Sequence, residues 1–502
     1  MQRLSNATLA AAPPEVARPR YERAALHSGI VHLGIGAFMR AHLAVATEAA
    51  LHGGDLRWGI LGVSLRQADT RDALAPQDGL YTVAVRDAGN DAGTNAGGRA
   101  RQRLQVIGCV TRLLVAAESP AAVLDAIAAP ATRIVSLTVT EKGYAHDPAT
   151  RTLRFEHPEI THDLAHAAAP RSAIGFIVHG LARRRAAGRE PLTLLSLDNL
   201  PCNGRTLQGL VLAFAERVDP SLAHWINQGC TFPSSMVDRI VPRTTDIDRR
   251  QVQAQLGLHD AWPVMAEPFF DWAVEDRFAA GRPAWDQGGA RFVAAAAPFE
   301  TLKLRMVNGA HSTIAYLGAM AGWRTVDVAI GQPALRHAIE RLMRDEVEPT
   351  LPAMAGLDLV AYRASLLARF ANSALAHRTQ QIAMDGSQKL PQRLLGTVRD
   401  RLGAGQPIVR LGLGVAAWLH YLRGRDEQHQ TYAIDDPLSD ALAGLLRDAA
   451  PLDDVAARVA ALTHFAPVFG DLAGNPVLVN AVAMALDSLQ TRGVRATLHD
   501  LP

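Results

Sequence analysis

The chain has 502 residues, of which 48% are hydrophobic and 20% charged, a composition typical of a globular protein with two or three domains. Its net charge of +2 forms no basic tail or stripe, so nucleic acid is not an expected partner. Three cysteines without a CxxC pair argue against a disulfide framework and against a cysteine-built zinc site. No apolar run approaches the roughly 20 residues of a membrane span, so we expect a cytoplasmic protein without membrane contact.

A strand, a glycine turn and a helix are predicted near the start of the chain. Ile30–Leu33 has the pattern of a short buried strand, Gly34 and Gly36 follow it, and a helical pattern extends to Leu51. This layout points backbone N–H groups at a pyrophosphate and predicts a dinucleotide site. Met39 stands where the dinucleotide fingerprint has its third glycine, so an ordinary tight turn also fits these residues.

The second predicted strand, Trp58–Leu65, is followed by an acidic residue, Asp69. An acid at this place in a dinucleotide fold holds the adenosine ribose hydroxyls and disfavours a 2′-phosphate, which predicts NAD(H) as the cofactor. Arg66 favours the 2′-phosphate instead and leaves NADP(H) as the less favoured alternative. Asp69 also fits the N-cap of a helix beginning at Thr70, and the two roles are compatible.

Polar clusters follow two further predicted strands. Arg133–Val139 runs into Thr140–Tyr144, and Leu192–Leu197 runs into Asp198–Gly204. Ligands of doubly wound sheets bind beyond the carboxyl ends of the strands, so both clusters are expected to lie near a bound ligand.

The character of the sequence changes near Arg291. The strands before it predict an α/β fold with a Rossmann-like NAD-binding domain at residues 1–290. The pattern after it is almost wholly helical and predicts an α-helical substrate and catalytic domain at residues 291–502. After a helix that contains Lys303, the sequence predicts further helices at Ala334–Asp345, Leu357–Phe370, Pro391–Leu402, Ile408–Leu422 and Val455–Leu462.

Lys303–His311 carries three side chains that fit one chemistry. Apolar residues around it recur at helical spacing and predict an α-helix, on which Asn308 and His311 lie roughly 140° and 80° round from Lys303. A lysine, an amide and an imidazole on one broad face fit proton transfer and oxyanion stabilisation, whereas three ordinary polar residues on a solvated face are the simpler alternative. Gly309 costs about 1 kcal/mol inside a helix, which indicates that something packs or binds closely there.

A series of motifs in one order gives a more specific signal. The motifs are Gly34-x-Gly36-x-Phe38-x-Arg40-Ala41-His42, Thr140-Glu141-Lys142-Gly143-Tyr144, Asp198-Asn199, Met236-Val237-Asp238-Arg239-Ile240-Val241-Pro242 and Lys303-(x)4-Asn308-x-x-His311. With them the sequence resembles the polyol-specific long-chain dehydrogenase family, which includes mannitol 2-dehydrogenases, D-arabinitol 4-dehydrogenases and fructuronate reductases. The likeness extends from about Ile30 to past residue 480.

Within this family, the segments Lys303–Met306 and His377–Arg393 are most similar to those of fructuronate reductases, also called D-mannonate oxidoreductases. Mannitol 2-dehydrogenases carry a substrate-pocket arginine where this chain has Gln381. The resemblance therefore implies NAD-dependent reduction of a 2-keto sugar or ketouronate, with D-fructuronate to D-mannonate favoured. The alternatives are the D-fructose/D-mannitol reaction and the D-arabinitol 4-dehydrogenase reaction.

The resemblance also implies a reaction without a metal and roles for single residues. Lys303 would be the general base and acid, Asn199 and Asn308 would hold the reacting oxygen, and His311 would orient the substrate. Burial and a nearby cation such as Lys389 would lower the pKa of Lys303. The other implied positions are Glu300 on a proton path, Asp238, Lys389, Arg378 and Arg393 in the substrate site, and Gly34, Gly36, Ala37, Phe38, Arg40, Asp69 and Glu141 in the cofactor site.

Several alternatives stay open. A ketouronate needs a cation for its carboxylate, for which Arg378, Lys389 and Arg393 are candidates, whereas a neutral polyol needs none. Arg305 lies about 200° from Lys303 on an α-helix and is not expected in the same pocket. A buried Asp238–Arg239 pair is also explained as purely structural.

Two other protein classes share part of the pattern. A non-catalytic NAD-binding sensor would need the glycine turn but not the lysine, asparagine and histidine together. A hydroxyacid or phosphogluconate-type dehydrogenase also pairs a Rossmann domain with a helical domain that bears lysine and asparagine. The sequence shows no interface signature, so we expect a monomer or weak oligomer that binds a sugar, polyol or uronate.

Overall fold

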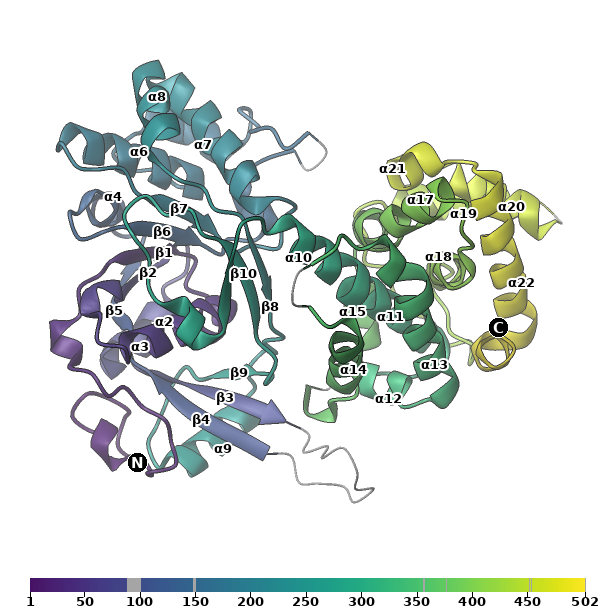
Figure 1. The fold of residues 1–502 in the computed structure, drawn as a ribbon, viewed down its shortest axis with the longest axis horizontal. Coiled ribbons are helices and arrows are strands. Elements are labelled where there is room, and N and C mark those ends of the chain that lie inside the picture. The colour runs from purple at the N-terminus through teal and green to yellow at the C-terminus, as the bar shows by residue number, and fades with distance from the viewer. Residues whose placement is uncertain are drawn as a thin grey trace. The chain divides into compact units, whose positions relative to one another are not determined.

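The computed structural model describes residues 1–87, 101–147, 150–354, 357–375, 377–450, 452 and 454–501. It divides into two compact units, Met1–Phe299 and Glu300–Pro502 (Figure 1). All strands of the described ranges lie in the first unit, and the second unit is built from helices. The α/β fold class with a mostly helical C-terminal part is confirmed.

A five-stranded parallel sheet forms the centre of the first unit. Its strands, in spatial order, are β5 (Val110–Val115), β2 (Ile60–Ser64), β1 (Ile30–Leu33), β6 (Ile134–Leu137) and β7 (Thr193–Ser196). The strand order runs outward from β1 in both directions, which is the order of a dinucleotide-binding Rossmann fold. The four strands predicted from the sequence correspond to β1, β2, β6 and β7, with β1 predicted to the residue.

Helices cover both faces of this sheet, so its strands are buried on both sides and are apolar almost throughout. Val31 and Leu33 of β1 point to the face covered by α4 (Pro120–Ala128), α6 (Ala173–Ala186) and α7 (Asn203–Val218). Ile30 points to the opposite face, where α2 (Leu43–Leu51) packs. The alternation follows from the period of two along a strand.

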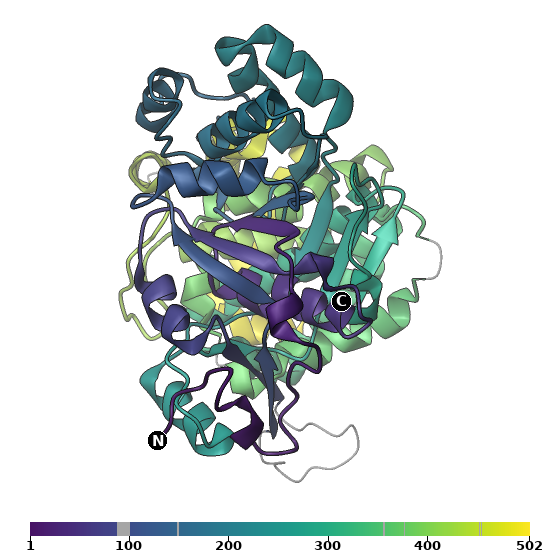
Figure 2. The ribbon, with the colours of Figure 1, turned by 90° about the vertical axis from the view of Figure 1, so that its left-hand side faces the viewer.

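Two three-stranded sheets complete the first unit. One has the order β4 (Arg101–Ile107), β3 (Tyr81–Asp87) and β9 (Val264–Ala266), and the N-terminal segment packs against it beside α9 (Asp246–Leu256) (Figure 2). The other has the order β11 (Ala290–Val293), β10 (Asp271–Glu275) and β8 (Ser235–Asp238). The remaining α-helices of this unit are α1 (Ala37–Ala41), α3 (Asp69–Leu74), α5 (Pro158–Ala165) and α8 (Pro220–Gly229).

The helical unit surrounds one large apolar core. Helix α18 (Val409–Tyr421) lies in this core and contacts α11 (Ala310–Met320) and α22 (Pro476–His499). The other α-helices are α12 (Val326–Ile330), α13 (Pro333–Arg341), α14 (Leu359–Phe370), α15 (Thr379–Ala383), α16 (Gly386–Leu390), α17 (Gly396–Gly403), α19 (Ser439–Ala449), α20 (Val455–Thr463) and α21 (Ala466–Phe469). Over the described ranges, no helix combines the length and apolarity that crossing a membrane requires.

Three segments of the helical unit are π-helical rather than α-helical: η7 (Lys303–Gly309), η8 (Leu342–Val347) and η11 (Pro391–Leu395). Segment η7 continues from α10 (Ala297–Leu302) into α11, and it contacts both η8 and η11. Turns of π-helix are rare and occur frequently at functional sites. Each one inserts an extra residue, which shifts the side chains that follow it.

Candidate active site

The glycine turn of the first unit lies at the carboxyl end of β1, at the point where the strand order reverses. Gly34 has φ +94°, and a Cβ there would lie 2.1 Å from the carbonyl oxygen of Thr138, so only glycine fits. A Cβ on Gly36 would meet nothing nearer than the Gly34 carbonyl oxygen at 3.9 Å. The turn therefore leaves open space in front of the start of α1, where a dinucleotide phosphate binds in this fold.

Met39 occupies the position at which the dinucleotide fingerprint has its third glycine. Its side chain is fully buried in the core below the sheet, and the helix breaks three residues later at His42 (φ −122°, ψ −85°) before α2 begins. The His42 ring is stacked between Phe38 and Phe270, with ring centroids 5.0 and 4.5 Å away. The short α1 and the buried Met39 side chain therefore take the place of the longer helix and third glycine of the fingerprint.

Asp69 lies in the first turn of α3, just after β2, and its side chain is exposed. The prediction that Asp69 is the N-cap is wrong, because the helix begins one residue earlier and Ala68 takes that position. Arg66 forms an ion pair with Glu159 at 2.8 Å. The Arg66 guanidinium is therefore held by an acidic side chain of the protein, although exposed ion pairs of this kind contribute little.

Asp198 organises the carboxyl ends of β6 and β7. Its carboxylate accepts hydrogen bonds from the backbone N–H groups of Val139 (3.0 Å) and Thr140 (2.9 Å) and from the Tyr144 hydroxyl (2.8 Å). Burial raises the pKa of Asp198, while these hydrogen bonds oppose the rise. Asn199 follows as an exposed residue, which places its amide at this edge of the sheet.

Thr140 adopts φ +62° and ψ 166°, a conformation that is strained for a β-branched residue. Its backbone N–H donates to the Asp198 carboxylate, which helps to hold the residue in this conformation. Glu141, the next residue, is exposed at the start of a short 3-10 helix. Strain of this size persists where the surrounding structure fixes it, most often at functional sites.

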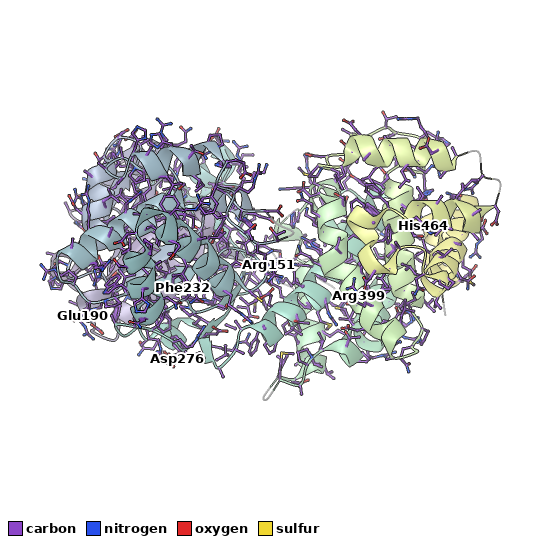
Figure 3. The ribbon with its side chains drawn as sticks, turned by 90° about the horizontal axis from the view of Figure 1, so that it is seen from above. Arg151, Glu190, Phe232, Asp276, Arg399 and His464 are labelled. Atoms are coloured by element: carbon purple, nitrogen blue, oxygen red, sulfur yellow. The ribbon has the colours of Figure 1, made fainter. Side chains whose placement is uncertain are left out.

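Asp238 is a buried residue at the end of β8, opposite Asp271 of β10. Its neighbour Arg239 donates hydrogen bonds to the carbonyl oxygens of Glu267 and Ala41, and burial lowers its pKa to about 10. Arg239 thus has the structural role expected of a buried arginine. Phe232, labelled in Figure 3, is buried at the start of the segment that leads into β8.

Arg40 is also directed into the protein. Its guanidinium donates to the carbonyl oxygen of Trp262 at 2.6 Å and lies 5.3 Å from the centre of the Tyr81 ring. Burial lowers the pKa of Arg40 to about 10. These contacts hold the end of α1 against β3 within the first unit.

The segment Lys303–Gly309 is π-helical, so the angles expected from an α-helix are wrong. In a π-helix each N–H bonds to the carbonyl five residues earlier, and Asn308, five residues after Lys303, therefore lies about one turn above it instead of roughly 140° away. His311 follows three residues later in α11, at the spacing of neighbours on one helix face. From this spacing we expect the three predicted side chains to lie in one row.

Lys303 is 8% exposed, whereas Asn308 and His311 are half-buried. Arg305, two residues after the lysine, forms an ion pair with Asp400 at 2.6 Å and donates to the Thr350 hydroxyl at 2.8 Å. These contacts engage the guanidinium, and its separation from the pocket of Lys303 stays a prediction.

Gly309 is explained by the close approach of η11. A Cβ on Gly309 would lie 2.7 Å from the carbonyl oxygen of Arg393, which is backbone and has little freedom to move. The expectation that something packs closely against this glycine is confirmed, and the neighbour is the chain itself. The glycine lets η7 and η11 approach, which sets Arg393 beside the row formed by Lys303, Asn308 and His311.

Replacing Gly309 by alanine is expected to destabilise the protein by about 1–3 kcal/mol, because the added methyl group overpacks this contact. The matched control is Gly444→Ala in α19, where a Cβ would meet only an Arg447 side-chain nitrogen at 3.8 Å. Alanine there should stabilise by up to about 1 kcal/mol through helix propensity. Thermal unfolding of both variants measures the difference, and an unchanged Tm for Gly309→Ala would contradict the packing argument.

His311 lies among rings and cations. Its ring is stacked on Phe370 with centroids 5.3 Å apart, and the ring of His377 meets it edge-on at 5.1 Å. The pKa of His311 is held well below its usual value, first by burial and then by neighbouring positive charges. The fixed charges are those of Arg393, Arg369 and Lys389, and His377 adds to them only when it is protonated. At neutral pH the imidazole is therefore uncharged and can exchange hydrogen bonds with a hydroxyl group.

Two of the three predicted carboxylate-binding cations reach this region. The Lys389 ammonium donates to the carbonyl oxygens of Ile382 and Met384 and lies 3.7 Å from the Asp385 carboxylate. The Arg393 guanidinium donates to the Ser312 hydroxyl at 2.9 Å. Burial, followed by the charge of Arg393, lowers the pKa of Lys389, and burial also lowers the pKa of Arg393. Such desolvated cations favour an anionic ligand.

Arg378 is placed differently. It precedes α15 as an exposed residue whose backbone pairs with Thr325, and Gln381 is exposed on the same helix. Glu300 lies in α10, one turn before Lys303, and is half-buried. Among the described residues, no group of three or more histidine, cysteine or acidic side chains is arranged to hold a metal ion.

Two residues beside His311 received no role from the sequence. Arg369, at the end of α14, is 8% exposed, and His377 lies in the connection to α15. Both residues are far from Lys303 in the sequence, so their place near His311 could not be predicted. Only the folded helical unit brings α14 close to α11. The signal that was available is the density of polar residues between positions 372 and 393.

The chain matches known proteins over nearly its whole length. Residues 28–287 match the mannitol dehydrogenase Rossmann domain, and residues 296–490 match the mannitol dehydrogenase C-terminal domain. D-mannonate oxidoreductase of Escherichia coli (strain K12) is 44% identical over 485 residues, which cover 96% of this chain and 97% of that protein.

Two solved structures resemble the whole chain. Pseudomonas fluorescens mannitol 2-dehydrogenase, in a ternary complex with NAD and D-mannitol, has a TM-score of 0.85 at 38% identity and covers 100% of this chain and 99% of its own. D-sorbitol dehydrogenase in its substrate-free form has a TM-score of 0.89 at 33% identity and covers 99% and 100%.

Proposed function

Because this chain belongs to the mannitol dehydrogenase family of oxidoreductases, we propose that it reduces D-fructuronate to D-mannonate with NADH. The family resemblance read from the motifs is confirmed, and a non-catalytic sensor is no longer needed to explain the glycine turn. The observation that carries the substrate proposal is the presence of Lys389 and Arg393 beside His311. A ketouronate brings a carboxylate to such a place, whereas a neutral polyol does not need the cations.

NADH is proposed as the donor because the first unit offers an open glycine turn and an acid at the ribose position. Asp69 would accept hydrogen bonds from the ribose hydroxyls and repel a 2′-phosphate. Arg66, the residue suited to a 2′-phosphate, is engaged by Glu159 at 2.8 Å. The proposed division of roles gives nucleotide binding to residues 1–290, with Ala37, Phe38 and Glu141 near the cofactor, and gives substrate binding and catalysis mainly to residues 291–502.

NADH would supply the hydride that adds to the substrate carbonyl carbon. Lys303 is proposed to donate a proton to the carbonyl oxygen and to recover one along a path past Glu300. Asn308, one π-helical turn from Lys303, would donate a hydrogen bond to that oxygen as its negative charge develops, and Asn199 is the second proposed donor. His311, uncharged at neutral pH, would fix a neighbouring hydroxyl of the substrate.

Arg393 is the cation best suited to the carboxylate. Within the described residues, its guanidinium has one hydrogen bond, to Ser312, and an arginine carries five N–H donors in a planar fork. Lys389 would add a point charge beside it, since its ammonium already donates to two backbone carbonyl oxygens. Asp238 and Arg378 are kept as further proposed substrate contacts on the strength of the motif resemblance.

A neutral ketose such as D-fructose is the second candidate. Asp385 lies 3.7 Å from the Lys389 ammonium and neutralises part of its charge. A solved relative with 38% identity binds D-mannitol. If Asp385 fully neutralises Lys389, the preference of the site for an anionic substrate is weaker.

The test compares D-fructuronate with D-fructose at equal concentrations while NADH consumption is followed. We expect kcat/KM for D-fructuronate to be at least about 10- to 100-fold higher, as charge-assisted hydrogen bonds of about 1.5–3 kcal/mol predict. Repeating the assay with NADPH tests the proposed role of Asp69. A preference for D-fructose would instead identify a mannitol 2-dehydrogenase activity and make Gln381 the residue to explain.

A further inference from the structure

His377 stands out because the proposed reaction assigns it nothing, although it contacts the candidate catalytic row. Its ring meets His311 edge-on, with centroids 5.1 Å apart and planes at 71°. In the described part of the chain, its Nδ1 atom is buried and has no hydrogen-bond partner. Buried polar atoms in folded proteins almost always have a partner, so this nitrogen calls for an explanation.

The missing partner leaves the protonation pattern of the ring undecided. Which nitrogen of a neutral histidine carries the proton is normally fixed by the hydrogen bond that the other nitrogen makes. Within the described residues Nδ1 has no such bond, and it is buried out of reach of a ligand. A ligand acceptor would therefore have to reach Nε2, and it would fix the proton on that nitrogen.

The charges around His377 identify the kind of acceptor. Arg369 on α14 and Lys389 on α16 both act on it, and together with burial they lower its pKa. His311 on α11 faces it as an uncharged ring, and Asp385 is the carboxylate beside Lys389. Several cationic groups converge on one small region, which favours an anion over a neutral hydroxyl.

We propose that His377 is a specificity-determining residue that donates a hydrogen bond to the substrate carboxylate alongside Lys389 and Arg393. The inference rests on the proposed function, because it requires a substrate that carries a carboxylate. His377 would be the third group, after Lys389 and Arg393, to bind the carboxylate. At neutral pH it would do so as an uncharged hydrogen-bond donor.

The sign of the accompanying proton movement follows from the same contacts. In the free protein the pKa of His377 lies below its ordinary value, so the ring is neutral at pH 7. A carboxylate bound beside it raises this pKa. Binding therefore takes up a fraction of a proton, and the affinity for a carboxylate substrate increases as the pH is lowered from about 7 towards 6.

The first variant is His377→Phe, which keeps a ring against His311 and removes both nitrogens. We expect KM for D-fructuronate to rise about tenfold with kcat changed less than about threefold, the effect of losing one hydrogen bond to a charged group. KM for D-fructose should stay within about twofold. His337→Gln on the exposed surface of α13 is the matched control and should leave both substrates unaffected.

The second variant is His377→Gln, which keeps a donor but cannot titrate. It should recover much of the affinity lost in His377→Phe while losing the increase in D-fructuronate affinity between pH 7 and pH 6. Calorimetric titration of D-mannonate into the complex with NADH, in two buffers of different ionisation enthalpy, measures the proton uptake directly. Uptake that persists in His377→Gln would assign the proton to His311 and overturn the proposal.

The outcomes separate this inference from the proposed function. If the unaltered enzyme prefers D-fructose, the uronate proposal fails and the inference fails with it. If the unaltered enzyme prefers D-fructuronate and His377→Phe keeps that preference, the inference alone is overturned. Equal losses with both substrates would show that His377 only supports the His311 ring, which also contradicts a role in specificity.

Discussion

Lys303→Ala is expected to lower kcat by about 10²–10⁴-fold, to the edge of detection, while NADH binding stays close to that of the unaltered protein. The side chain is 8% exposed and lies in the π-turn with Asn308, so its removal takes the proposed proton donor away from the reacting oxygen. NADH binding, followed by quenching of protein fluorescence, separates loss of chemistry from loss of folding. Substantial retained turnover would exclude Lys303 as the acid and base.

Lys303→Arg sharpens this test, because arginine keeps the positive charge but does not deprotonate in proteins. If Lys303 serves only as a cation, the arginine variant should retain most of the activity. If it moves a proton, the arginine variant should be nearly as impaired as Lys303→Ala. Measuring both variants with the same substrate and cofactor distinguishes charge from proton transfer.

The composition of the chain gives this comparison additional weight. Lysine and arginine together number 51, and Lys142, Lys303 and Lys389 are the lysines among them. Nearly every fixed cation of the protein is therefore an arginine. Two of the three lysines lie in the candidate site, which is where a group that can lose its proton has a use.

The Rossmann part of the fold was readable from local patterns. Strands β1, β2, β6 and β7 are short apolar runs that end in glycine or polar clusters, and both of their faces are buried, so the sequence signal is strong. The smaller sheets were not predicted. Their strands pair across long sequence distances, as β3 does with β9, and no local sequence pattern identifies the partner strand.

The helix that carries Lys303 shows where periodicity fails. Apolar spacing predicted a helix around Lys303 correctly but could not reveal the π-turn, because a one-residue insertion disturbs the pattern less than the scatter of natural sequences does. Gly309 was the local clue, and its cause is tertiary: the Arg393 carbonyl oxygen leaves no room for a side chain. Similarly, Arg369 and His377 lie near His311 only because α14 packs near α11, which no local pattern in the sequence predicts.

Asn308→Ala is expected to lower kcat by about 10²–10³-fold, which corresponds to about 3 kcal/mol of barrier, if the amide donates to the developing oxyanion. In an α-helix this side chain would point roughly 140° away from Lys303, and the prediction would be weak. In the π-helix the two residues lie one turn apart, so both can address the same oxygen. KM should change little, because the hydrogen bond strengthens as negative charge develops.

Asn308→Asp is the matched variant. It keeps the size of the side chain and replaces the N–H donor by an acceptor, so it should be at least as impaired as Asn308→Ala when the oxyanion role is correct. Steady-state kinetics with D-fructuronate and NADH measure both variants, and thermal unfolding checks that each is folded. A loss of less than tenfold in Asn308→Ala would rule out the oxyanion role and would leave the π-turn needed only to bring Lys303 and His311 together.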